Sequence, residues 1–163
     1  DRLLSGKQKP FSSILFNTNN QKILTGLGKK DLEKLQLHTD FPYAKPVELI
    51  KLLLNQINTS NATILDFFGG SGTTGQAVLE LNKEDNGNRQ FILIEQLEYA
   101  KTLTTERIKK YIDKNNLNTG FTYSELLGHD LNSYISISEI TKYKPSLTKD
   151  DRQINEILYN IKL

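Results

Sequence analysis

Hydrophobic positions along the middle of the chain follow two different periods. Apolar side chains recur at helical spacing after Pro46, at Val47, Ile50, Leu53, Leu54 and Ile57. Proline suits the start of a helix because its missing N–H needs no partner there. Residues 62–67 are expected to form a buried strand, and 89–95 a second one, whose continuous apolar run is typical of a sheet that is covered on both faces. The pattern predicts a helix followed by two buried strands.

Further elements follow from the same periodicities. We expect helices over 73–82 and 98–115 and a third strand over 121–127. Residues 134–143 are β-branched and ambiguous. A last helix should begin near Thr148, with one apolar face made by Ile154, Ile157, Leu158 and Ile161. Residues 1–40 are polar and irregular, with a short strand at 12–16 and a short helix around Leu32 as candidates. Alternating strands and helices predict an α/β fold.

The segment between the first strand and the next helix is the most informative one. The strand ends at Asp66, and two aromatic residues, Phe67 and Phe68, follow it. The turn Gly70-Ser71-Gly72-Thr73-Thr74-Gly75 then leads into the helix that begins near Thr73. Open α/β sheets bind ligands beyond the carboxyl ends of their strands, and glycines let the backbone approach a ligand closely. A nucleotide-type ligand is therefore expected at this turn.

Three classes of ligand could use such a turn. A phosphate loop is excluded because no Lys follows the last glycine. The turn matches the dinucleotide pattern G-x-G-x-x-G, and Glu95 lies at the spacing of that pattern's acidic residue, so NAD stays open. Asp66 would repel a pyrophosphate but attract an ammonium or sulfonium group, and Phe67 and Phe68 offer ring faces to an adenine or a cation. These residues favour S-adenosylmethionine.

The chain resembles a known family over about residues 41–112. The pattern Asp66-x-Phe68-x-Gly70-x-Gly72 is similar to the cofactor motif of amino-methylating DNA methyltransferases. Residues 66–82, and then 88–95, resemble the modification subunits of type III restriction–modification systems. Residues 41–50, which include Lys45-Pro46, resemble the motif that precedes the glycine turn in those enzymes.

The resemblance implies a partial Rossmann-like methyltransferase sheet with helices on both faces, S-adenosylmethionine as cofactor and the N6 of adenine in DNA as methyl acceptor. Asp66 would bind the methionine end, Glu95 the ribose hydroxyls, with Glu98 as a competitor, and Lys45 the cofactor's carboxylate. The expected cofactor-binding set is Lys45, Asp66, Phe67, Phe68, Gly70, Gly72, Thr73, Thr74 and Glu95. The plainer alternatives are a turn-capping Asp66, a solvated Lys45 and ordinary first-turn threonines.

Methyl transfer in this family also needs an Asp-Pro-Pro-Tyr motif for the flipped adenine. The sequence contains no such motif, and Asp40-Phe41-Pro42-Tyr43 is only a near-match. We therefore assign no catalytic residue and expect the carboxyl-terminal part of a longer frame. The expected division is a recognition-region tail (1–40), a cofactor-binding part (41–130) and a helical extension (131–163). Its expected partners are DNA, an amino-terminal methyltransferase part or second modification subunit, and a restriction subunit.

Composition adds few constraints to this assignment. The chain has 163 residues, a net charge of +2 and no Cys, which excludes a disulfide framework and thiolate chemistry. No apolar run is long enough for a membrane span, so we expect a cytoplasmic protein without a membrane partner. His38 and His129 stand alone, and we expect no metal site. An NAD(P)-binding protein and a non-catalytic interaction remnant remain the alternatives.

Overall fold

The computed structural model describes residues 23–24, 26–37, 40–57, 59–127, 136–143 and 154–160, and it describes side chains as far as residue 125. The helices are α1 (Leu27–Lys34), α2 (Val47–Asn55), α3 (Thr73–Asp85), the π-helical turn η1 (Ala100–Thr104) and α4 (Thr105–Lys114). The strands are β1 (Thr63–Asp66), β2 (Gln90–Glu95), β3 (Gly120–Leu127), β4 (Ser136–Tyr143) and β5 (Ile154–Asn160).

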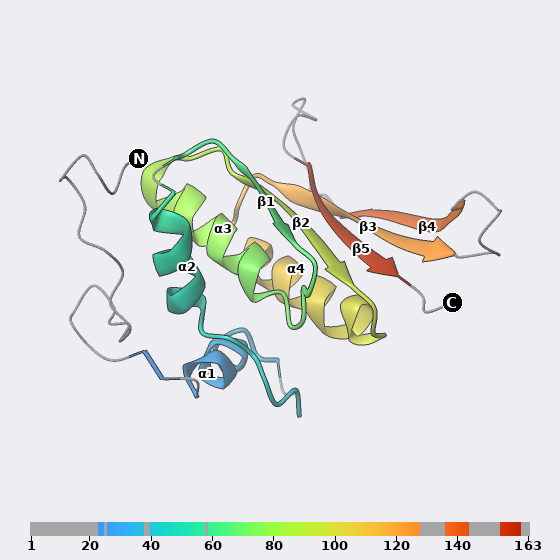
Figure 1. Ribbon diagram of the computed structural model, residues 1–163, viewed down its shortest axis with the longest axis horizontal. Helices are drawn as coiled ribbons and strands as arrows, with labels where there is room; N and C mark the ends of the chain where they lie inside the picture. The colour runs from blue at the N-terminus through green and yellow to red at the C-terminus, as the bar shows by residue number, and fades with distance from the viewer. Residues whose placement is uncertain are drawn as a thin grey trace.

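The strands form one mixed sheet in the order β1-β2-β5-β3-β4 (Figure 1). Strands β1, β2, β5 and β3 are parallel, and β4 runs antiparallel to β3. Asp66 lies opposite Leu93 in the register of β1 and β2, so these two strands end side by side. The loops that follow β1 and β2 therefore leave the sheet at the same edge.

The main core lies between the sheet and the two helices α3 and α4 (Figure 1). Phe91 and Leu93 of β2 point into it and meet Val78 of α3 and Ile108 of α4. The other face of the same strands carries Leu65, which is 49% exposed, and Ile92 and Ile94, which are half-buried. In the part of the chain that the structure describes, α2, α3 and α4 all lie on one side of the sheet.

The expectation of helices on both faces is therefore wrong for these described helices. The apolar run of β2 arises because this strand lies between two parallel neighbours, which shield Ile92 and Ile94 in part. The predicted amphipathic face of α2 also fits only in part. Val47 is buried, but Leu53 and Ile57 are 46% and 52% exposed.

Most of the other predicted helices and strands are present in the structure. The strands at 62–67, 89–95 and 121–127 and the helices that begin at 47, 73 and 98 are confirmed within a few residues. The last helix is wrong, because Ile154–Asn160 is strand β5, which pairs with both β2 and β3. Its apolar residues fit helical spacing, but backbone pairing with two parallel neighbours overrides that local pattern.

Some expectations lie outside the described residues. These are the strand at 12–16, the two histidines His38 and His129, and the helix start at Thr148. The division of the chain at residues 40 and 130 stays a prediction. No helix among the described residues is long and apolar enough to cross a membrane.

Candidate functional site

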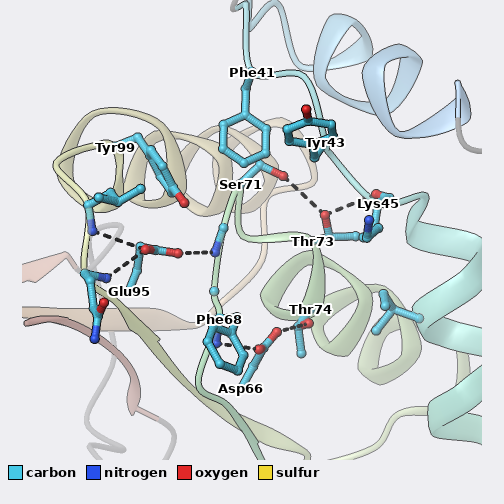
Figure 2. Close-up of a pocket in the computed structure, with 15 residues that line it drawn as sticks. Phe41, Tyr43, Lys45, Asp66, Phe68, Ser71, Thr73, Thr74, Glu95 and Tyr99 are labelled. Carbon is cyan, nitrogen blue, oxygen red and sulfur yellow. Dashed lines mark hydrogen bonds between the residues drawn. The ribbon is translucent and has the colours of Figure 1, made fainter.

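A cleft of about 530 Å³ opens at the carboxyl ends of β1 and β2. It is bounded by the glycine turn after β1, the loop after β2 and the extended segment before α2 (Figure 2). Its lining residues are Phe41, Tyr43, Lys45, Ile50, Asp66, Phe68, Gly69, Gly70, Ser71, Thr73, Thr74, Glu95, Gln96, Leu97 and Tyr99. The cleft therefore lies where the sequence predicts a ligand.

The glycine turn is tight because two of its residues adopt left-handed backbone conformations. Gly70 and Gly72 have φ of +54° and +79°, which residues with a Cβ rarely adopt. Gly72 N–H donates to the Gly69 carbonyl at 2.8 Å, and Gly69 N–H donates to the Ile94 carbonyl at 2.9 Å. These bonds attach the turn to the end of β2 and aim the start of α3 at the cleft.

Asp66 closes β1 and faces the cleft. Its Oδ1 accepts the Phe68 N–H at 3.0 Å, and its Oδ2 accepts the Thr74 hydroxyl at 2.6 Å (Figure 2). The capping role is therefore present. A carboxylate has about four acceptor sites, so these two bonds leave it able to accept from a ligand.

Glu95 holds two loops together, a structural role that the sequence does not indicate. It is only 8% exposed. Its Oε2 accepts the Gly70 N–H at 2.9 Å, and its Oε1 accepts the N–H groups of Gln96 and Leu97 at 2.7 and 3.1 Å. One carboxylate thus joins the turn after β1 to the loop after β2. Its rival Glu98 is exposed and does not line the cleft.

Lys45 and Thr73 meet at the opposite end of the cleft. The Thr73 hydroxyl donates to the Lys45 carbonyl at 3.1 Å, where the extended segment enters α2 (Figure 2). The Val47 N–H at the start of α2 donates to Asp31 of α1 at 3.0 Å. The cleft therefore has carboxylates at the ends of β1 and β2 and an ammonium group near the start of α2.

Aromatic side chains form a wall that sequence analysis did not assign to the site. Phe41 and Tyr99 contact edge to face, with their ring centroids 5.0 Å apart, and Tyr43 is 75% exposed beside them (Figure 2). Burial and the neighbouring Glu95 carboxylate raise the pKa of the Tyr99 hydroxyl. Phe41 and Tyr43 lie four and two residues before Lys45 in the same extended segment, and this nearness was the signal that could have revealed them.

The structure brings most, but not all, of the predicted residues to the cleft. The residues that line it are Lys45, Asp66, Phe68, Gly70, Thr73, Thr74 and Glu95. Phe67 is 60% exposed and is not part of the lining. Gly72 does not line the cleft either, and it packs against Thr104, where an added Cβ would lie 3.1 Å from Thr104 Cγ2.

The parallel strands β1 and β2 carry a glycine turn and acidic residues at their tips, in the position where open α/β folds place a ligand. Comparison with known proteins gives the family: residues 5–106 match the DNA methylase family, to which this chain belongs. This confirms the resemblance that the sequence motifs carry.

Curated relatives include modification subunits of type III restriction–modification enzymes. The StyLTI Mod subunit of Salmonella typhimurium is 44% identical over 66 residues, which cover 40% of this chain and 10% of that protein. The probable HindVI Mod subunit of Haemophilus influenzae is 32% identical over 114 residues, which cover 69% of this chain and 14% of that protein. The type II methyltransferase M.KpnI of Klebsiella pneumoniae is 35% identical over 77 residues, 47% of this chain and 18% of that protein. The chain thus spans less than a fifth of the length of these relatives.

Proposed function

We propose that the cleft binds S-adenosylmethionine, with the methionine end near Asp66 and Lys45 and the ribose near Glu95. The observation that carries this proposal is the pair of carboxylates at the tips of β1 and β2. Asp66 at the mouth of the glycine turn disfavours a pyrophosphate and favours a ligand that carries positive charge, and Glu95 can accept from ribose hydroxyls. The exposed ring of Phe68 offers a face to the adenine or to the sulfonium.

The chain's own residues would bind and orient this ligand. Asp66 retains acceptor sites for an ammonium group, and Lys45 supplies a cation for a carboxylate. Glu95 holds the glycine turn, so its oxygens would meet the ribose hydroxyls from a fixed position. S-adenosylmethionine would supply a methyl group on a sulfonium sulfur, which an amino nitrogen can attack directly. The protein's contribution to such a reaction is positioning.

We further propose that this cleft serves methyl transfer to the N6 of adenine in DNA, as part of a cytoplasmic type III modification subunit. Membership of the DNA methylase family and the similarity to type III modification subunits support this proposal. The sequence lacks an Asp-Pro-Pro-Tyr motif, so a second polypeptide segment would have to hold the flipped adenine. DNA, that segment and a restriction subunit are the partners that the proposal requires.

Calorimetry on the 163-residue chain tests the cofactor assignment. Titrations with S-adenosylmethionine, S-adenosylhomocysteine and NAD should give saturable heats for the first two only. Asp66→Asn provides a variant of nearly unchanged shape without the charge, and its affinity for both should fall. Saturable NAD binding with no response to either sulfur compound would overturn the assignment.

A further inference from the structure

Arg107 of α4 is a buried cation directly beneath the glycine turn. Its side chain is fully buried, at 0% exposure. Its Nη1 donates to the Ser71 carbonyl at 3.2 Å, to the Ser71 hydroxyl at 2.9 Å and to the Thr73 hydroxyl at 2.9 Å. Its Nε donates to Gln76 Oε1 of α3 at 2.7 Å. One guanidinium group therefore contacts both the turn and the first helical turn of α3.

The position of Arg107 is unfavourable for stability alone. All four of its acceptors are neutral oxygens, and its Nη2 has no hydrogen-bond partner among the described residues. Asp31 and Glu80 attract this charge without a direct hydrogen bond to it, and burial still outweighs them, so a desolvation penalty remains. An apolar residue of similar volume is often at least as stable at such a site. Burial lowers the pKa of Arg107 to about 10, so it still carries its charge at neutral pH. This cost suggests a role in the site above it.

The hydrogen bonds of Arg107 extend to Lys45 through one hydroxyl. A guanidinium group can only donate, so the Thr73 hydroxyl must accept from Arg107. The proton of that hydroxyl is then directed to the Lys45 carbonyl, 3.1 Å away. Arg107 thereby orients a chain of bonds that ends at Lys45, two residues before α2.

The π-helical turn η1 explains how α4 reaches this point. Thr104, at the end of η1, donates its hydroxyl to the Gly70 carbonyl at 2.5 Å. Arg107 is one helical turn further along and binds the next residue, Ser71. Carbonyls of two successive turn residues are thus held from below by two side chains of η1 and α4. Such π-helical insertions occur frequently at functional sites.

We propose that Arg107 is a positioning residue that holds Thr73 and Lys45 in place for the amino-acid end of the bound cofactor. This inference rests on the proposed binding of S-adenosylmethionine. Arg107 is covered by the turn and does not touch the ligand. Its effect should therefore be confined to the end of the cleft where Thr73 and Lys45 lie. The adenosine end, near Glu95, is held by separate bonds to backbone N–H groups.

A pair of ligands separates this role from general support of the fold. S-adenosylhomocysteine has the amino-acid end, whereas 5′-methylthioadenosine keeps the adenosine and sulfur but lacks that end. Calorimetric dissociation constants for both are measured on the wild type and on Arg107→Met, which replaces the cation by an apolar chain of similar length. Lys109→Met, at a half-exposed position of the same helix, is the control.

The expected result is a change in the ratio of the two dissociation constants. Arg107→Met should weaken S-adenosylhomocysteine at least about tenfold, equivalent to about 1.4 kcal/mol, and change 5′-methylthioadenosine less than about threefold. Lys109→Met should change neither. Arg107→Lys keeps the charge but offers no planar fork, so it should recover only part of the loss. Equal weakening of both ligands, or no weakening of either, would overturn the positioning role.

A second pair of variants decides the question if Arg107→Met does not fold. Thr73→Val replaces the hydroxyl that accepts from Arg107 and donates to Lys45 by a methyl group, and Thr73→Ser keeps a hydroxyl there. Thr73→Val should selectively weaken S-adenosylhomocysteine, and Thr73→Ser should recover most of that affinity. If the two variants bind alike, the inference is wrong. Absence of binding of either sulfur compound by folded wild type would instead overturn the cofactor assignment itself.

Discussion

Replacing Glu95 by Gln tests whether the cleft depends on this carboxylate for its shape. The substitution preserves size and changes one oxygen into an NH₂ group. Glu95 accepts three backbone N–H groups, one on Oε2 and two on Oε1. The amide should keep its oxygen toward Gln96 and Leu97 and turn its NH₂ toward Gly70. The N–H of Gly70 then faces another donor.

The magnitude follows from these bonds. A buried donor left without an acceptor costs about 1–3 kcal/mol. The two remaining bonds lose their charge assistance, which costs about 0.5–1 kcal/mol each. The expected loss in the free energy of unfolding is therefore about 2–5 kcal/mol, a large part of the stability of an ordinary domain. With a urea slope of about 2 kcal/mol per M, this corresponds to a midpoint lowered by about 1–2.5 M.

Urea unfolding followed by circular dichroism measures this loss. Glu98→Gln is the matched control, because the same chemical change at an exposed side chain should alter stability by no more than about 0.5 kcal/mol. If Glu95→Gln and Glu98→Gln had the same midpoint, the three bonds would carry no net stabilisation. The carboxylate would then be free for a ligand, and its architectural role would be refuted.

The remaining predictions concern the cofactor, the core and the acid limb of stability. Asp66→Ala should weaken S-adenosylmethionine by about 1.5–3 kcal/mol in calorimetry, the value of a hydrogen bond to a charged group, and unchanged affinity would contradict its role. Gly75→Ala should lower the free energy of unfolding by about 1–3 kcal/mol, because the new Cβ would lie 2.7 Å from Ile108 Cδ1, whereas Gly26→Ala, with open space around it, should not destabilise the chain. A side-chain hydrogen bond from Arg89 lowers the pKa of Asp85 from its ordinary value of 3.8. The Asp85 carboxylate therefore stabilises the fold above pH 3.8 and loses this contribution as the pH falls further, so the urea midpoints of wild type and Asp85→Asn should converge below pH 3.8. The 163-residue chain alone should transfer no tritiated methyl group to DNA until a chain with an Asp-Pro-Pro-Tyr motif is added, and activity that is lost in Tyr43→Ala would show that the near-match is catalytic.

The helices and strands around the glycine turn could be predicted from the sequence because each is indicated by a pattern of neighbouring residues. Pro46 and the apolar spacing after it indicate a helix, and the run from 90 to 95 indicates a strand whatever its neighbours are. Strand β5 was not readable, since its apolar spacing also fits a helix and only pairing with β2 and β3 decides between them. Long-range pairing of this kind leaves little trace in a single sequence.

In the candidate site, too, residues of a short local motif could be predicted from the sequence, and residues contributed by a distant helix could not. Asp66 and the glycines form one short motif, and their place in the cleft follows from the strand and turn that carry them. Arg107 and Thr104 lie more than thirty residues from the turn they support, and nothing in a polar segment rich in Lys and Thr distinguishes them. Burial alone reveals them, because charged or polar side chains at 0% exposure need specific partners.

The place of β5 in the sheet also determines when the domain can form during synthesis. Strands β2 and β3 are not neighbours, and β5 lies between them although it is the last of the five strands to be made. Once β4 has left the exit tunnel, the β1–β2 pair and the β3–β4 pair still lack the strand that hydrogen-bonds them into one sheet. Closing the sheet requires contacts between residues more than sixty positions apart, such as Ile92 and Glu156, and contacts of that kind slow folding. Until residue 160 leaves the exit tunnel, the inner edges of β2 and β3 stay unpaired, and the nascent chain is most exposed to misassociation during that interval.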